Sequence, residues 1–206
     1  MTITNGYCTQ AEFNAQMGLD DDYSEASAHI AINAASRAVD EYCHRRFYSD
    51  AAVSTVTYQA DDPYRLIVQD FQTLTGLIVA TDDGDTGSYS TTWTITTDFV
   101  ARLWRDALSG TPSASLAAVG GRCFPVGGRR PLRVSVTHRL GWAAVPPEVT
   151  QATLIKAAQM FRRKDSPDGV AGGEGFGAIR ITRYQDPTVA ELLNPLVKVS
   201  RAALVL

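Results

Sequence analysis

The sequence predicts an α+β protein, mainly a helical bundle of three to four helices with a β-rich insertion and an extended or flexible C-terminal tail. Apolar residues recur at helical spacing near both ends of the chain, and β-branched runs alternate with polar residues between about 53 and 138. Five glycines fall within the nine residues 169–177. We therefore expect a helical core over residues 1–165 that contains the β-rich insertion at about 53–138. A glycine-rich hinge and a C-terminal docking segment are expected over 166–206.

The first helix is predicted by Thr9 and Glu12, which have the spacing of a capping box, and Gly18 is placed to end it. A second helix is expected to open after the acidic run 20–22 and Ser24, because negative charge suits a helix N-terminus. One flank repeats at helical spacing, with Ala28, Ile32, Ala35, Val39 and Tyr42. The other flank carries Ile30, Ala34 and Ala38, so burial on more than one side is expected.

The middle of the chain reads as strands, expected at 53–58, 66–68, 77–79, 92–96 and 132–138. Segment 82–87 is rich in aspartate and glycine, but it lacks the alternating acids and distant glutamate of an EF-hand, so we expect a hairpin turn. Segment 109–121 reads as a loop. Alternation along the last strand places Arg133, Ser135 and Thr137 on a solvated side.

Pro146 and Pro147 start a third helix, whose apolar stripe is expected to pair with the second helix. Its stripe comprises Val149, Ala152, Ile155, Ala158 and Met160 or Phe161. A short last helix is expected after Asp186 as N-cap and Pro187 in the first turn, with Pro195 ending it.

Composition bounds the classes of function. The chain has 206 residues, 45% hydrophobic and 20% charged, which is ordinary for a globular protein. A net charge of −3 argues against a dedicated nucleic-acid binder. No apolar run approaches the about 18 residues of a membrane helix, and the N-terminus lacks a secretory signal. We expect no membrane partner and residence in the cytoplasm of the cell that makes the protein.

No catalytic motif is recognisable, so we expect no enzyme, no cofactor and no metal. His29, His44 and His138 are expected to be structural or at the surface, since geometry and not presence defines a site. The cysteines are odd in number and widely spaced (Cys8, Cys43 and Cys123), which predicts buried free thiols.

The densest glycine cluster follows a helix instead of a strand, and no Gly-Lys-Ser/Thr accompanies it, so a phosphate-binding loop is not predicted. We expect a hinge that a partner orders. Its glycines are Gly169, Gly172, Gly173, Gly175 and Gly177.

Two further groups of residues are candidates for partner contacts. The arginines are Arg122, Arg129, Arg130, Arg133 and Arg139 near the last strand, with Arg162, Arg163 and Lys164 at a helix end. They are read either as charge pairing on a solvated face, or as contacts with an acidic protein or passing DNA phosphates. The apolar residues of the tail are expected to pack either on their own domain or against a partner. They are Val189, Leu192, Leu193, Leu196, Val197, Val199, Leu204, Val205 and Leu206.

The order of several motifs resembles the head–tail connector (adaptor, or head completion) proteins of long-tailed bacteriophages, with a tail like that of actinobacterial phage members. Those motifs are the Thr-x-x-Glu-Phe helix at 9–13, the Val39–Phe47 helix end, Gly141–Val149, Phe161-Arg-Arg, and the Ser166–Pro195 tail. The likeness covers nearly the whole chain and is weakest in its middle.

This resemblance implies a non-enzymatic structural protein of the virion neck, assembled in the host cytoplasm. It implies a dodecameric ring beneath the portal protein, joining the DNA-filled head to the tail or stopper. The C-terminal segment would engage the portal, with Leu192, Leu193, Leu196, Val197, Val199, Leu204, Val205 and Leu206 as docking residues. Neighbouring copies, a stopper or tail-completion protein, and double-stranded DNA passing without specific binding would be its partners.

Three alternatives stay open from the sequence. A small hydrolase or transferase would need a concave pocket that holds converging titratable groups. A nucleic-acid-binding factor could use the arginines between 129 and 139, and would show salt-dependent affinity for duplex DNA. A tail-completion or stopper protein of the same neck is the nearer rival, although such proteins are more often dominated by strands.

Overall fold

The computed structural model describes residues 2–18, 24–103, 113–163, 170–171, 179–180 and 186–198. The chain divides into two compact units. Unit 1 comprises Met1–Phe47 and Val145–Leu206, and unit 2 comprises Tyr48–Ala144.

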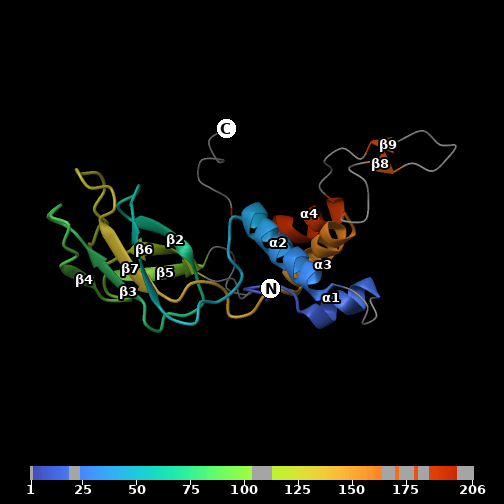
Figure 1. Cartoon of the computed structure of the whole chain (residues 1–206). Coiled ribbons are helices and arrows are strands. Elements are labelled where there is room, and N and C mark those ends of the chain that lie inside the picture. Colours follow the sequence, from blue (N-terminus) through green and yellow to red (C-terminus); the bar gives the residue numbers. More distant parts are fainter. Residues whose placement is uncertain are drawn as a thin grey trace. The chain divides into compact units, whose positions relative to one another are not determined.

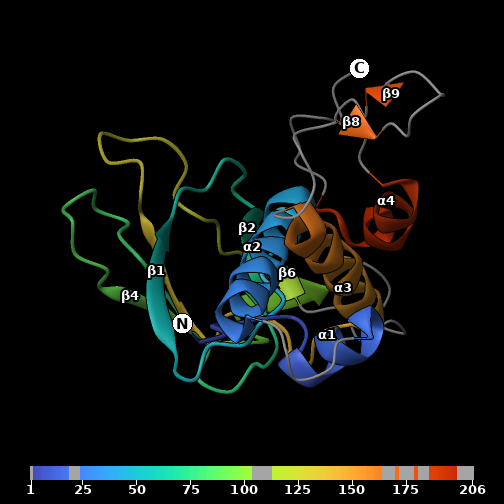
Figure 2. The same ribbon diagram turned by 45° about the vertical axis from the view of Figure 1, so that its right-hand side comes forward.

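The described part of unit 1 is built from helices (Figures 1 and 2). They are α1 (Gln10–Met17), α2 (Glu25–Cys43), α3 (Pro147–Arg162) and α4 (Pro187–Leu193), followed by the 3₁₀ turn η3 (Asn194–Leu196). Helix α2 packs along α3, as the sequence predicts, while α1 and α4 both contact α3. Two short strands, β8 (Val170–Ala171) and β9 (Ile179–Arg180), pair antiparallel.

The capping box at the start of α1 is confirmed. The Glu12 N–H donates to the Thr9 hydroxyl oxygen at 3.2 Å, and the Thr9 N–H donates to the Glu12 carboxylate at 2.7 Å. Gly18 ends the helix in the left-handed region with φ +62°, which glycine adopts without a steric cost. Local sequence therefore determines both ends of α1.

The core of unit 1 uses small residues where helices meet and aromatic residues between them. Ala28, Ala35 and Ala157 are fully buried, and Phe13 meets Phe161 edge to face with ring centroids 5.5 Å apart. The expectation that both flanks of α2 are buried is wrong. Ile30 is 52% exposed and Ala34 is exposed, because the buried residues of α2 lie along one side only.

Unit 2 contains two antiparallel sheets. The first has the order β1-β7-β3-β4, formed by Ser54–Tyr58, Val134–His138, Ile78–Thr81 and Thr91–Trp93. The second has the order β2-β6-β5, formed by Arg65–Phe71, Ser113–Ala118 and Phe99–Leu103. The expected hairpin is confirmed: β3 pairs with β4, and the aspartate-rich segment connects them.

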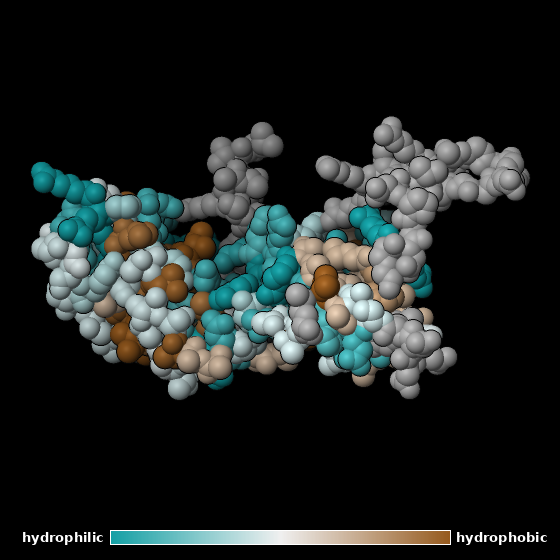
Figure 3. Space-filling model, in the orientation of Figure 1, coloured by the Kyte–Doolittle hydropathy of each residue, from teal (hydrophilic) through white to brown (hydrophobic). Residues whose placement is uncertain are grey.

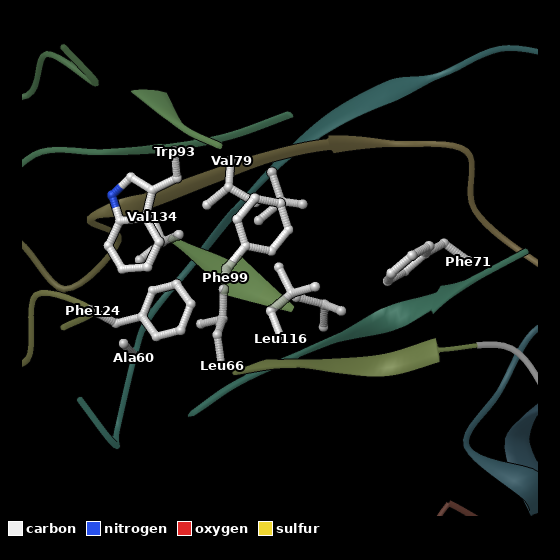
Figure 4. Close-up of a cluster of buried hydrophobic side chains, with 11 residues drawn as sticks. Ala60, Leu66, Phe71, Val79, Trp93, Phe99, Leu116, Phe124 and Val134 are labelled. Carbon is white, nitrogen blue, oxygen red and sulfur yellow. The ribbon is translucent and has the colours of Figure 1, made fainter. Parts of the chain in front are cut away.

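Apolar side chains from both sheets of unit 2 form one core (Figure 4). Trp93 and Phe124 stack with ring centroids 4.6 Å apart, and Leu66 and Leu116 from the second sheet are fully buried. The Trp93 indole N–H donates to the buried Thr81 hydroxyl at 3.0 Å, so its polar edge is satisfied inside the core. Aromatic side chains therefore fill much of the space between these small sheets.

The expectation of a mainly helical bundle is wrong, although the α+β class is right. Among the described residues, there are four α-helices and both a four-stranded and a three-stranded antiparallel sheet. The segment expected as a loop contains β6, the central strand of the second sheet, and β5 was not expected at all. Alanine and serine in β6 carry little strand propensity, so its pairing with both neighbours determines its structure.

The segments where the chain enters and leaves unit 2 lie side by side. The Asp50 N–H donates to the Leu140 carbonyl at 3.0 Å, and the Arg139 Nε donates to the Asp50 carbonyl at 2.7 Å. Gly141 has φ +98°, and a Cβ atom there would overlap the Tyr48 carbonyl oxygen. Only glycine allows the two backbone segments to come this close.

Candidate interaction surfaces

In the parts of the chain that the structure describes, three titratable side chains meet in unit 1: the Tyr7 hydroxyl donates to the Asp40 carboxylate, and Arg37 Nε lies 3.2 Å from the same carboxylate. Within those parts, no group of three or more His, Cys, Asp or Glu residues is placed to hold a metal ion. His29 contacts the Gln10 side chain through Nε2 at 2.9 Å, and His44 is exposed at the C-cap of α2. Nor is any helix in the described ranges long and apolar enough to cross a bilayer.

His138 is the one completely buried histidine. It lies at the end of β7, where Nε2 pairs with the Tyr58 hydroxyl at 3.1 Å and the Phe71 ring lies 5.5 Å away between centroids. Burial lowers the pKa of His138 to about 4, and the negative charge of Asp50 opposes this only partly. The imidazole is therefore a neutral part of the unit 2 core at neutral pH.

The cysteines are all free. Cys8 and Cys43 are buried, as expected, and burial raises the pKa of each thiol to about 12. Cys123 is exposed, contrary to the expectation that all three thiols are buried. It precedes Phe124, whose ring is in the core, so the alternation of side chains turns Cys123 outward.

The last described segment is fixed to the C-terminal end of α2. The Tyr42 hydroxyl donates to Asn194 Oδ1 at 2.6 Å, and the Lys198 N–H donates to the Cys43 carbonyl at 2.9 Å. Asp186 caps α4 as expected, accepting the Thr188 N–H at 3.0 Å. This end of α2 is therefore the place from which residues beyond 198 continue.

The apolar residues of this segment divide between the core and the surface. Val189 and Leu193 are buried within unit 1, so packing on the chain itself is what the structure shows for these two. Leu192, Leu196 and Val197 are half-buried and keep apolar surface. The other tail candidates lie outside the described residues, namely Val199, Leu204, Val205 and Leu206.

The candidate hinge glycines also lie outside the described residues: Gly169, Gly172, Gly173, Gly175 and Gly177. Strands β8 and β9 are described, and Ala171 pairs with Ile179.

The candidate arginines are not all available to a partner. Arg133 is 8% exposed, and its guanidinium donates to the carbonyl oxygens of Asp82 at 2.9 Å and Asp83 at 2.8 Å. It therefore holds the β3–β4 loop to the start of β7. The alternation of the sequence predicts Arg133 in solvent, and this prediction is wrong. Arg122 pairs with Asp98 at 3.0 Å.

Arg129 and Arg130 are exposed in the loop before β7. Their backbone N–H groups donate to the Asp85 carboxylate at 2.7 and 3.1 Å, which fixes their loop to the β3–β4 connection. Arg162 and Arg163 are exposed at the end of α3, in the other unit. The exposed arginines among the candidates are thus divided between the two units.

Exposed apolar side chains are concentrated in unit 2. Among the described residues, the exposed large hydrophobic residues are Ile30 in unit 1 and Val53, Tyr64, Ile67, Leu74, Ile78, Val126 and Leu132 in unit 2. Figure 3 shows brown apolar side chains intermingled with pale ones over unit 2. Sequence periodicity did not identify this surface, because its residues come from separate segments.

The outward face of the first sheet is aligned by strand register. Thr55 pairs with Thr137, which pairs with Ile78, and the Thr55 and Thr137 hydroxyls are 2.7 Å apart. The next row along the sheet joins Thr57, Ser135, Ala80 and Thr92. We call these residues the threonine face: Thr55, Thr57, Ile78, Ala80, Thr92, Ser135 and Thr137.

Comparison with known proteins places this fold among particle structures. No protein-family model and no curated protein matches the chain. A chain in the neck of a native GTA particle computed with C12 symmetry is similar, with TM-score 0.57, 18% identity, and coverage of 97% of this chain and 93% of the other.

Two further structures give the same result. A chain in the neck of an empty GTA particle computed with C6 symmetry has TM-score 0.55 and 18% identity, covering 97% of this chain and 94% of the other. A chain in the virion of a native gene transfer agent particle has TM-score 0.55 and 20% identity, with the same coverage of 97% and 94%. The chain shares the fold of these proteins over almost its whole length.

Proposed function

We propose that this chain is a structural protein of the neck of a phage-like particle. It forms a ring beneath the portal and joins the DNA-filled head to the tail or stopper. The observation that carries the proposal is the fold similarity over 97% of the chain to proteins in two GTA neck structures. The order of sequence motifs supports the same role independently of the fold.

The proposed ring suits the chemistry of the surface. Exposed apolar side chains on unit 2 offer area for protein contacts. Many modest contacts repeated around a closed ring give a stable joint, because each contact after the first is effectively intramolecular. A net charge of −3 suits a channel through which DNA passes without specific binding.

The C-terminal segment is the proposed portal-docking element. Lys198 is held beside the end of α2, so the residues after it start from a fixed point. Leu196 and Val197 retain apolar surface there, and the sequence beyond them ends in further apolar residues. The glycines of 169–177 serve in this proposal as the hinge, and Arg129, Arg130, Arg162 and Arg163 as contacts with acidic protein surface or DNA.

Removal of residues 199–206 tests the docking role, because this cut leaves α4, Asn194 and the Lys198 hydrogen bond in place. The full chain and the truncated chain are each mixed with the portal protein encoded by the same genome, and the complexes are separated by size with light scattering. The full chain is expected to co-elute with the portal, and the truncated chain is expected to elute separately with an unchanged helical signal.

Two results would contradict the proposal. If the full chain fails to join the portal, the neck role is wrong. If the truncated chain joins as well as the full chain, docking by the tail is wrong while the neck role stands. Salt-dependent binding of the isolated chain to duplex DNA would favour the nucleic-acid-binding alternative.

A further inference from the structure

The threonine face is an exposed sheet surface that carries no charged side chain. Its members alternate with the buried residues Val136, Val79 and Trp93 of the same strands, so they point away from the core. None of its members is Asp, Glu, Lys or Arg, in a chain of which 20% is charged. The outward positions of β2, in the other sheet, include Arg65 and Gln69. The second sheet therefore has a charged outward residue, Arg65, whereas the threonine face has none.

One end of the threonine face is apolar. Ile78 is 51% exposed, and Val53 and Leu74, from the segments before β1 and before β3, are 51% and 53% exposed. Gly76 lies under the Val53 side chain, since a Cβ atom there would be 3.3 Å from Val53 Cγ1. The segment before β1 and the β2–β3 connection therefore bring these side chains to the same end of the sheet.

We propose that the threonine face and its apolar end form the surface by which one copy of this chain contacts the next copy. Depletion of charged residues is typical of the centre of a protein interface. This inference rests on the proposed ring.

The second copy is the favoured occupant because proteins of this fold occur in necks computed with C12 and C6 symmetry. A ring of identical chains needs a contact in which one surface of each copy meets a different surface of the next. Such a contact is repeated at every subunit, so each copy must keep this surface free of unpaired charge that association would bury. The threonine face meets that requirement without further change.

Site-specific photo-crosslinking tests the inference. A benzophenone amino acid replaces Thr57, which is exposed on the threonine face, or Gln69, an exposed strand residue in the other sheet, as the matched control. The full-length chain is irradiated alone and with the portal, and covalent dimers are measured. The yield of covalent dimer is expected to be at least about tenfold higher from the Thr57 position than from the Gln69 position. Equal yields would overturn the inference.

Charge substitution gives a second readout. Thr57→Lys is expected to weaken self-association by about tenfold or more, whereas Gln69→Lys changes it less than about twofold. Circular dichroism checks that both lysine variants fold. If Thr57→Lys does not fold, crosslinking from a benzophenone amino acid at Thr92, on the same face, gives the second readout.

The outcomes separate this inference from the proposed function. A ring with crosslinks at Gln69 instead of Thr57 overturns the interface and keeps the neck role. Crosslinked copies at Thr57 with no ring and no portal binding support the interface and overturn the neck role. If Thr57 gives no crosslinks and the chain forms no ring and does not bind the portal, both the interface and the neck role are overturned.

Discussion

The hydrophobic cores of the two units are filled by different kinds of side chain. Unit 1 brings helices together through alanines, such as Ala28 and Ala35 on α2, and leaves Ile30 as its one exposed large hydrophobic residue among those described. Unit 2 fills the space between two small sheets with aromatic rings and leaves several large apolar residues exposed. Unit 2 is therefore the unit better suited to contacts with partners.

The largest expected effect is confined to unit 2. Gly141→Ala places a methyl group against the Tyr48 carbonyl at a positive φ, so we expect a loss of more than about 4 kcal/mol in the free energy of unfolding of unit 2. Thermal unfolding followed by the strand signal measures it. Gly121→Ala is the control, since it has φ +78° but nothing within 4 Å of the added atom. A similar loss in both variants would show that strain, and not the close approach to Tyr48, is responsible.

The core of unit 1 is expected to be nearly as sensitive. Phe13→Ala removes a fully buried ring that contacts Phe161, at a cost of about 3 kcal/mol to unit 1. The helical signal should melt earlier, while the strand signal of unit 2 is retained. Gln16→Ala, on the exposed side of the same helix, should change little. If Phe13→Ala lowers both signals together, the two units do not unfold separately.

Acid should weaken unit 2 through His138. The pKa of His138 in the folded state is about 4, against 6.5 for an ordinary histidine, so between these values the unfolded chain binds the proton more readily. The stability that the neutral ring contributes is present above pH 6.5 and decreases as the pH falls towards 4, by on the order of 2 kcal/mol. Urea unfolding at several pH values measures this slope, and His138→Gln should flatten it. An unchanged slope in that variant would assign the acid sensitivity to other groups.

The smallest expected effect is at the start of α1. Thr9→Ala removes both the hydroxyl that accepts the Glu12 N–H and its contact with the Glu12 carboxylate, and should cost about 1 kcal/mol in unit 1. Thr9→Ser retains the capping oxygen and should stay within a few tenths of the parent. Chemical denaturation of the helical signal compares the two variants, and equal losses would contradict a capping role.

The helices were predictable from sequence because their signals are local. Thr9 with Glu12, Gly18, Pro147 and Asp186 each mark a helix end within one turn. The strands of unit 2 were only partly predictable. Strand β6 has no β-branched residue and pairs with β5, the strand before it, and with β2, which lies far from it in sequence. Contacts between distant segments leave no local pattern.

The same limit applied to the surfaces. Alternation placed Arg133 in solvent, but its guanidinium reaches back to the carbonyls of the β3–β4 loop, which no periodicity could indicate. The threonine face required the register that pairs Thr55, Thr137 and Ile78. The resemblance to phage neck proteins, in contrast, depends on the order of motifs along the sequence and on none of these side-chain contacts.

Electron microscopy of the chain bound to the portal tests the neck role most directly. The two proteins of the same genome are purified separately, mixed, and imaged as single particles. The proposed function predicts a closed ring of this chain on one face of the portal, with twelve-fold symmetry as in the native GTA neck structure. A complex in which the chain is absent from the portal, or bound as isolated copies at saturating concentration, would contradict it.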